Sequence, residues 1–241
     1  MDNQLRKTAA LYLIPSSLGE KQIDDIWPPG HRQLINTLEI FIVENVRTAR
    51  RFLRRAGYTK SFEEVQFHIL DKRTADTALL TFLDETLKGK AIGLLSEAGS
   101  PCIADPGQKV VALAHSLDIP VKPLTGPSSI LLALMASGMN GQHFQFHGYL
   151  PIDKSDRLRK IKELEDESMR TGASQIFMET PYRNNALAED LVKNCRANTS
   201  ICIAADLTME TEYIKTMTAG KWRESSLPQL HKRPAIFLLW S

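Results

Sequence analysis

The sequence is poor in features that mark several common protein classes. Its 241 residues include three cysteines, and none lies in a C-x-x-C pair or in a Cys/His spacing typical of zinc sites. The longest apolar run, Ile130 to Ala136, is far shorter than the ~20 residues needed to span a bilayer. The N-terminal Met1-Asp2-Asn3-Gln4 lacks the basic start of a secretory signal. We therefore expect a cytoplasmic chain with reduced thiols, no metal and no membrane partner.

Charge and nucleotide-binding loops are also scarce. The formal net charge is +2, so the overall charge does not predict nucleic-acid binding and any such case needs a local patch. Neither a G-x-G-x-x-G fingerprint nor a Walker loop is present, which weakens dinucleotide and ATP binding as interpretations. The 43% of hydrophobic and 24% of charged residues are ordinary for a globular protein.

Short apolar runs alternate with helical periodicity in the first half of the chain. The predicted strands cover residues 10–14, 41–43, 67–70, 91–95 and 119–122, and the predicted helices cover 32–38, 45–56, 74–87, 108–117 and 128–137. Strands separated by helices indicate a mostly parallel sheet with helices on both faces. The continuous apolar runs fit strands that are covered on both sides.

The pattern changes after the turn-rich residues 138–141. Strands are predicted at 144–150, 176–178, 201–205, 211–217 and 235–240, with helices at 154–169 and 186–195. Fewer helices between strands favour a mixed sheet. The predicted fold class is thus α/β with two α/β lobes, residues 1–141 and 142–241, and a ligand cleft between them.

The segment from Ser96 to Gly107 directly follows a predicted buried strand. In open α/β sheets, ligands bind beyond the carboxyl ends of the strands, and Gly99 permits close approach of the backbone to a ligand. Asp105 before Pro106 is typical of a helix N-cap followed by proline at the first helical position. A plain strand–loop–helix turn with a good cap explains the same residues equally well.

A second turn of this kind, residues 123–129, also follows a predicted strand and opens a helix. Its Gly126, Ser128 and Ser129 offer backbone flexibility and hydroxyl groups. Two such turns at neighbouring strand ends predict a small ligand that is held mainly by backbone groups.

The predicted helix 45–56 is strongly two-faced. Its basic stripe consists of Arg47, Arg50, Arg51, Arg54 and Arg55, at the i, i+3, i+4, i+7 and i+8 spacing of one helical face. Arginine forks suit phosphate contacts that are independent of base sequence. A solvated face or an interface ion-pair network is a competing interpretation. A second cluster, which includes Arg157 and Arg159, lies among acidic residues and favours an ordinary surface helix.

Residues 178–183 follow a strand of the second half. Glu179 in this segment is a candidate to orient a ligand or to act as a base, and a simple strand end is equally compatible with it. The six histidines are scattered, and no Ser/His/Asp or metal arrangement is recognisable.

These segments together resemble the tetrapyrrole-methylase-like superfamily of S-adenosylmethionine (SAM) methyltransferases, and within it the branch that 2′-O-methylates a cytidine ribose of small-subunit ribosomal RNA. The corresponding motifs are Leu11–Gly19 for the strand and Pro-Thr-x-x-Gly-type turn, Glu44–Arg47 for Glu-Asp-Thr-Arg, Ser96–Gly107 for the cofactor loop, Thr125–Pro127 for Pro-Gly-Pro, Gly148–Pro151 for Gly-Phe-Leu-Pro, Met178–Arg183 for Tyr-Glu-Ser-Pro-His-Arg, and Asp206–Thr208 for Glu-Leu-Thr. They follow the family's order over most of the chain.

The resemblance implies that SAM is the cofactor, that it binds between two α/β lobes, and that the protein is a homodimer. The implied cofactor-binding residues are Pro15, Glu97, Ala98, Gly99, Ser100, Pro101, Ile103, Ala104, Gly126, Ser128, Ser129, Met178, Ala205, Leu207, Pro234 and Ala235.

Three positions depart from the RNA-methylating branch. Asn45 stands where that branch has an acid, and residues 68–72 replace its His/Asn-rich segment. The branch also has a region beyond the last strand, which is expected to help hold RNA, and this chain stops at Ser241. SAM is therefore a firmer expectation than the acceptor.

Three functions follow as hypotheses. The first is methylation of an RNA ribose 2′-hydroxyl, with Arg50, Arg51, Arg54 and Arg55 binding the substrate. The candidate catalytic residues are then Glu44 and Glu179 as bases and Arg47, which would hold a phosphate or orient Glu44. The second is methylation of a tetrapyrrole or another small molecule. The third is a non-catalytic module that binds SAM or RNA.

Overall fold

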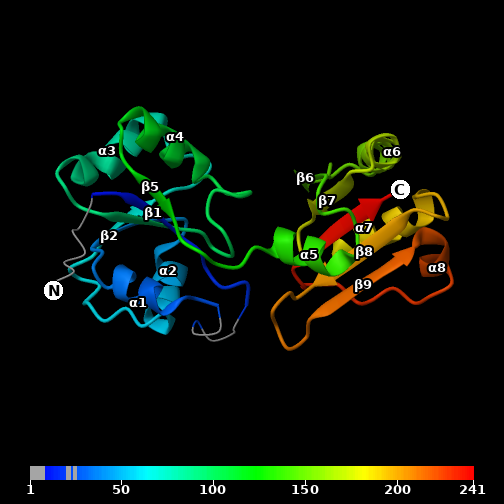
Figure 1. Ribbon diagram of the computed structural model, residues 1–241, viewed down its shortest axis with the longest axis horizontal. Coiled ribbons are helices and arrows are strands. Elements are labelled where there is room, and N and C mark those ends of the chain that lie inside the picture. Colours follow the sequence, from blue (N-terminus) through cyan, green and yellow to red (C-terminus); the bar gives the residue numbers. More distant parts are fainter. Residues whose placement is uncertain (1–8, 20–22, 24–25) are drawn as a thin grey trace. The chain divides into compact units, whose positions relative to one another are not determined.

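The computed structural model describes residues 9–19, 23 and 26–241, and the N-terminal tetrapeptide considered above lies outside these ranges. The chain divides into two compact units, Met1–Pro127 and Ser128–Ser241. Figure 1 shows one sheet with its helices in each unit.

The first unit contains a five-stranded parallel sheet. Its strands are β1 (Leu11–Ile14), β2 (Ile40–Val43), β3 (Gln66–Ile69), β4 (Ile92–Leu95) and β5 (Val121–Pro123). Their order in the sheet is β3-β2-β4-β1-β5, and every neighbouring pair is parallel. This confirms the parallel sheet predicted from the spacing of strands and helices.

Helices cover both faces of this sheet. They are α1 (Pro29–Ile35), α2 (Val46–Arg55), α3 (Asp76–Leu87) and α4 (Gln108–Ser116). The pair α1 and α2 lies on one side, and α3 and α4 lie on the other (Figure 1). Phe41 and Val43 point into the core under α1 and α2, while Ile40 and Ile42 point into the core under α3 and α4. Because both faces of β2 are buried, this strand needs a continuous run of apolar residues.

The second unit contains a mixed sheet, as predicted. Its strands are β6 (Phe144–Tyr149), β7 (Ser174–Met178), β8 (Ser200–Ala205), β9 (Tyr213–Thr218) and β10 (Ala235–Trp240). The order is β6-β7-β10-β8-β9, in which β6 and β7 are parallel and the other pairs are antiparallel. Its helices are α5 (Ser129–Ser137), α6 (Lys154–Thr171), α7 (Asn184–Asn194) and α8 (Ala219–Arg223).

The boundary between the units falls after Pro127, whereas the sequence placed it near Gly141. The reason is that α5 packs on β9 and β10 of the second sheet. Thr216 Oγ1 also donates a hydrogen bond to the Ser137 carbonyl oxygen at 2.8 Å. Gly138, with φ 72°, ends α5 in the left-handed conformation. The turn-rich residues 138–141 therefore mark a helix end.

Among the helices of the described residues, none combines the length and the apolar character that a membrane span requires.

Candidate functional site

The carboxyl ends of the parallel strands place several predicted residues at one edge of the first sheet. Pro15 follows β1, Glu44 follows β2 and Ser96 follows β4. The loops after β1 and β4 are joined by two backbone hydrogen bonds. The Ser16 N–H donates to the Gly99 oxygen at 2.9 Å, and the Gly99 N–H donates to the Ser16 oxygen at 3.2 Å.

Two buried serines, which the sequence analysis did not single out, reinforce this junction. Ser16 Oγ donates to the Ser96 carbonyl oxygen at 2.6 Å, and Ser96 Oγ donates to the Gly99 carbonyl oxygen at 2.8 Å. Position 16 corresponds to the threonine of the Pro-Thr-x-x-Gly-type turn, so a hydroxyl at this position was the available signal. Each buried hydroxyl thus holds the loop that carries the predicted cofactor residues.

The turn at residues 125–127 lies against the same junction. A Cβ atom on Gly126 would lie 2.1 Å from Pro15 Cγ, so only glycine permits this approach. Ser100 Oγ donates to the Pro127 oxygen at 3.2 Å. Pro15, the loop after β4 and this turn therefore come together. Ser128 and Ser129 belong to the second unit, where Ser128 precedes α5 without a side-chain capping bond.

The loop after β4 carries backbone strain. Cys102 and Ala104 have φ values of 68° and 63°, which are unfavourable for residues with a Cβ atom. The Asp105 carboxylate holds this conformation by accepting hydrogen bonds from the Cys102 and Gly107 N–H groups, each at 2.8 Å. The prediction that Asp105 caps the following helix is wrong, because α4 begins at Gln108 with Gly107 as its N-cap.

The surface of this loop combines exposed apolar side chains with backbone N–H groups that have no partner in the described part of the chain. Ala98, Ile103 and Ala104 are exposed, with Ile103 at 51%. The N–H groups of Ala98, Ser100 and Ala104 donate no hydrogen bond to any residue that the structure describes. Small-molecule sites combine apolar walls with a few well-placed polar groups, and here the backbone supplies them. Glu97 is committed elsewhere, since its Oε1 accepts a hydrogen bond from Thr48 Oγ1 at 2.6 Å.

Glu44 is half-buried beside two other acids. Burial is the main cause that raises the pKa of its carboxyl group, and the negative charges of Asp105 and Glu97 raise it further. The Glu97 backbone N–H and the Lys72 ammonium act in the opposite direction. Burial also raises the pKa of Asp105, against the lowering effect of its two backbone hydrogen bonds. Glu44 is therefore a stronger base than an exposed glutamate.

The helix that follows Glu44 begins with a side-chain cap. Asn45 Oδ1 accepts hydrogen bonds from the N–H groups of Arg47 and Thr48, at 2.9 and 3.3 Å. The capping role gives a structural reason for the amide at position 45. Among the described residues, the Arg47 side chain makes no ion pair, either with Glu44 or with any other acid.

The predicted arginine stripe lies on the exposed face of α2, but its members differ. The Arg54 guanidinium lies 4.1 Å from the centre of the Phe62 ring, and that of Arg50 lies 5.3 Å from the centre of the Phe67 ring. Such cation–π contacts hold a guanidinium against the surface. Arg55 donates to the Gly19 oxygen at 3.4 Å. Arg51 is exposed and makes no side-chain hydrogen bond with the described part of the chain.

The second unit also brings its predicted cofactor residues together. Met178 pairs with Ile236, and Ala205 pairs with Ala235, so the ends of β7 and β8 meet the start of β10 at one sheet edge. The Asp206 N–H donates to the Pro234 oxygen at 2.9 Å, and Leu207 is buried next to it.

Glu179 at this edge is fixed by its own turn. Its side chain is 0% exposed, and Oε1 accepts hydrogen bonds from the Thr180 N–H and from Arg183 Nη2, both at 2.6 Å. The other oxygen, Oε2, is buried without a hydrogen-bond partner among the described residues. A carboxylate that is paired with an arginine stabilises the turn and is less available as a base.

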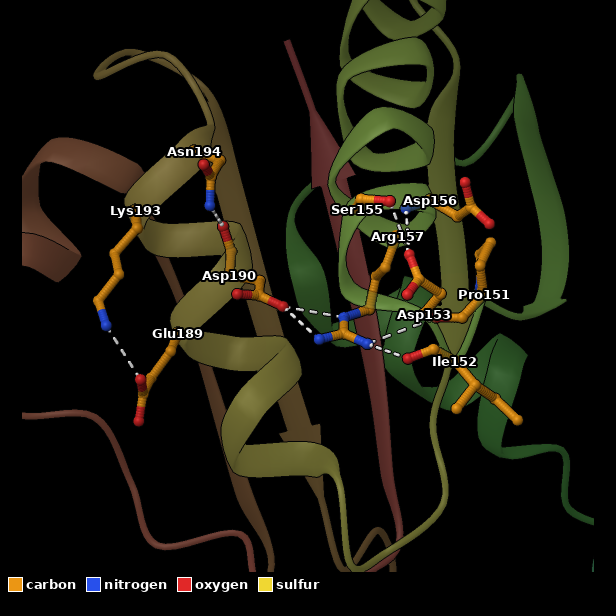
Figure 2. A network of polar contacts seen from close by, with 10 residues as sticks. All are labelled: Pro151, Ile152, Asp153, Ser155, Asp156, Arg157, Glu189, Asp190, Lys193 and Asn194. Carbon is orange, nitrogen blue, oxygen red and sulfur yellow. Dashed lines mark hydrogen bonds and ion pairs between the residues drawn. The ribbon is translucent and has the colours of Figure 1, made fainter.

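Arg157 differs from the surface residue that its basic cluster predicts. Its side chain is 9% exposed and forms an ion pair with Asp190, which is 8% exposed. Figure 2 shows Arg157 between Asp190 of α7 and the Ile152 carbonyl oxygen, with Nε, Nη2 and Nη1 donating at 2.8, 2.7 and 2.8 Å. The prediction is wrong because a charged pattern on a helix does not reveal a buried partner on a distant helix. The pair fixes the loop after Tyr149.

Comparisons with known proteins place these observations in a family. The profile of the family "Tetrapyrrole (Corrin/Porphyrin) Methylases" matches residues 29–222. The chain is 31% identical over 212 residues to ribosomal RNA small subunit methyltransferase I of Buchnera aphidicola subsp. Schizaphis graminum, an alignment that covers 88% of this chain and 70% of that protein.

Solved structures share the fold. The methyltransferase CobJ superimposes with a TM-score of 0.62 at 15% identity, over 96% of this chain and 94% of that one. The uroporphyrin-III C-methyltransferase of Thermus thermophilus, solved in complex with S-adenosylhomocysteine, gives a TM-score of 0.55 at 14% identity, over 96% and 97% of the two chains. Because both superpositions cover nearly the whole chain at low identity, they show a shared fold.

Proposed function

The chain belongs to the tetrapyrrole (corrin/porphyrin) methylase family and is a SAM-dependent methyltransferase, and from this premise we propose that its methyl acceptor is a ribose 2′-hydroxyl of ribosomal RNA. The observation that carries the acceptor is the 31% identity to a ribosomal RNA small subunit methyltransferase I. The exposed arginine face of α2 supports it, because guanidinium groups bind phosphates.

The reaction needs one proton acceptor and accurate alignment. The loop after β4 would hold SAM, which when bound would supply an electrophilic methyl group on a positively charged sulfur and a neutral thioether as the leaving group. The hydroxyl proton must leave as the new bond forms, and a positioned carboxylate can accept it. Alignment of the reacting groups can lower the activation free energy by about 7–11 kcal/mol.

Glu44 is the better supported of the two candidate bases. Its surroundings raise its pKa, and none of its hydrogen bonds involves an arginine of the described chain. Glu179 is paired with Arg183, which favours a positioning role at the start of α7. We assign Glu44 the proton and Arg47 a phosphate contact close to it.

The arginine stripe would bind the RNA backbone. The guanidinium of Arg50 lies over Phe67 and that of Arg54 over Phe62, and such contacts hold the two groups against the surface before a phosphate binds. Arg51 and Arg55 would add charge beside them. Such contacts position RNA without reading its sequence.

The test is transfer of tritium from labelled SAM to fractionated cell extract, with and without RNase. We expect label in the small ribosomal subunit RNA, lost on RNase treatment and released as 2′-O-methylnucleoside. The variant in which Arg50, Arg51, Arg54 and Arg55 are all glutamine should lose RNA binding, and wild-type binding should fall steeply with salt. Label in an RNase-resistant small molecule would instead identify a tetrapyrrole or another compact acceptor, and no turnover despite SAM binding would indicate a binding module.

Two further family expectations belong to this proposal. We propose that the enzyme is cytoplasmic, where its RNA substrate is made, and that it forms a homodimer. Analytical ultracentrifugation that gave the monomer mass of 27.1 kDa would refute the dimer.

A further inference from the structure

A pocket of about 260 Å³ lies on the first unit, beside the predicted cofactor loop. It is bounded by the segment after β3 and by the start of α4. Its polar lining consists of Asp71, Lys72, Thr74, Asp105, Gln108 and Lys109. Of these residues, only Asp105 has a part in the proposed reaction, as a neighbour of Glu44, and the other five polar lining residues have none.

This pocket adjoins the candidate base. Leu70, Asp105 and Pro106 line both the pocket and a narrow crevice that contains Glu44. The ammonium group of Lys72 is close enough to act on the Glu44 carboxyl through its charge. The pocket and the crevice of Glu44 are therefore neighbours that share part of their lining, although Glu44 itself does not line the pocket.

The turn after β3 holds Lys72 in place. Asp71 Oδ1 accepts hydrogen bonds from the Arg73 N–H at 2.7 Å and from Thr74 Oγ1 at 3.2 Å, and Thr74 Oγ1 accepts one from the Asp71 N–H at 2.9 Å. These bonds satisfy the turn locally and leave Lys72 at its apex.

The lining suits a sugar phosphate. Two carboxylates, an amide and a hydroxyl can exchange hydrogen bonds with sugar hydroxyls, and the ammonium group of Lys72 can donate hydrogen bonds to a phosphate. The formal charges of the four ionisable lining residues sum to zero, which does not favour a bare anion. The volume lies just below the ~300–1,000 Å³ typical of drug-sized ligands, so it matches one nucleotide better than a tetrapyrrole ring.

We propose that this pocket receives the ribose of the methyl-accepting nucleotide, with the 2′-hydroxyl toward Glu44 and the adjoining phosphate on Lys72. The proposal rests on the proposed function, and it adds the place on the protein where the acceptor binds. In this proposal Lys72 binds the substrate, and Asp105 positions the loop that lines both the pocket and the crevice of Glu44.

The first test is Lys72→Gln, assayed on small-subunit RNA. We expect about a tenfold rise in the KM for RNA with little change in kcat, since one charged contact to phosphate is lost. The slope of log KM against log salt should fall by about one. Lys72→Arg should restore most of the affinity, and the dissociation constant for SAM, measured by calorimetry, should not change.

Lys88→Gln is the matched control. Lys88 follows the C-terminal end of α3, pairs with Glu85 at 2.8 Å and does not line the pocket. Lys88→Gln removes the same charge and should leave the KM for RNA and the slope of log KM against log salt at the wild-type values.

A second variant fills the pocket without altering its charge. Gln108→Trp places a large ring on the first residue of α4, at the pocket wall. We expect methylation of RNA to fall by at least tenfold while SAM binding and the thermal unfolding midpoint persist. Wild-type KM values for both Lys72→Gln and Gln108→Trp, in an enzyme that methylates RNA, would overturn the pocket alone. A wild-type enzyme that does not methylate RNA would overturn the proposed function and this inference together.

Discussion

The two units differ in the partners of their buried and half-buried carboxylates. In the first unit, Glu44 and Asp105 lie near each other, and burial raises the pKa of both. In the second, three acids are each held by an arginine: Glu179 by Arg183, Asp190 by Arg157 and Asp206 by Arg233. The arginine pairs stabilise the packing of the second unit, whereas the two acids of the first unit make no ion pair with an arginine of the described chain. The difference suggests that proton transfer belongs to the first unit and positioning to the second.

The largest effect that we expect is on catalysis by the first unit, and its absence would contradict the comparison. Glu44→Gln keeps the size of the side chain and removes its ability to accept a proton. We expect kcat to fall by about 10²–10⁴-fold, the usual contribution of general base catalysis, with unchanged SAM affinity. Single-turnover methylation of RNA measures it. A variant with wild-type kcat would exclude Glu44 from the chemistry.

The corresponding test in the second unit is one of stability. Asp190→Ala leaves the Arg157 guanidinium buried without its partner, and breaking a buried pair in this way typically costs about 3–5 kcal/mol. Urea unfolding should report a loss of this size. The control is Glu189→Ala at the preceding residue. Glu189 forms an exposed ion pair with Lys193 at 3.0 Å (Figure 2), and this pair should contribute well under ~1 kcal/mol to stability. Equal losses for the two variants would contradict the distinction.

A smaller effect is expected from the close approach in the first unit. Gly126→Ala introduces a Cβ atom 2.1 Å from Pro15 Cγ, so the turn at 125–127 must move away from the loop after β1. Overpacking of this kind costs about 1–3 kcal/mol. If the turn contributes to the cofactor site, calorimetry should show weaker SAM binding, and Gly141→Ala, where a Cβ meets nothing within 4 Å, should leave it unchanged.

The smallest effect concerns the pH dependence of kcat. The base must be deprotonated to act, so kcat should rise with pH as Glu44 ionises. Because the negative charge of Glu97 raises the pKa of Glu44, Glu97→Gln should lower that pKa and move the acid limb of the profile to lower pH. The substitution keeps the backbone N–H of residue 97, so an acid limb that stays in place or moves to higher pH would show that the Glu97 charge does not raise the pKa of Glu44.

The elements themselves were largely predictable from the sequence. Helix α2 was recognised because arginines recur on one face and apolar residues on the other, and β2 because of its continuous apolar run, whereas the capping role of Asn45 emerged only from the structure. Helix α8, with five residues, is too short to show a helical period and was missed. The buried state of Arg157 was missed because its partner lies 33 residues away on another helix. The order of the motifs was enough to predict that the candidate cofactor residues follow the ends of strands. The proximity of Glu44 to Asp105 could not be predicted, because it depends on tertiary packing.

The double hydrogen bond between Ser16 and Gly99 has a consequence for motion. Because of these bonds, we expect the loops after β1 and β4 to open as one cooperative unit, although they are more than 80 residues apart in the chain. A molecule that steadies either loop must steady both, so amide deuterium uptake at Ser16 and Gly99 should slow in parallel when a ligand binds to one of them.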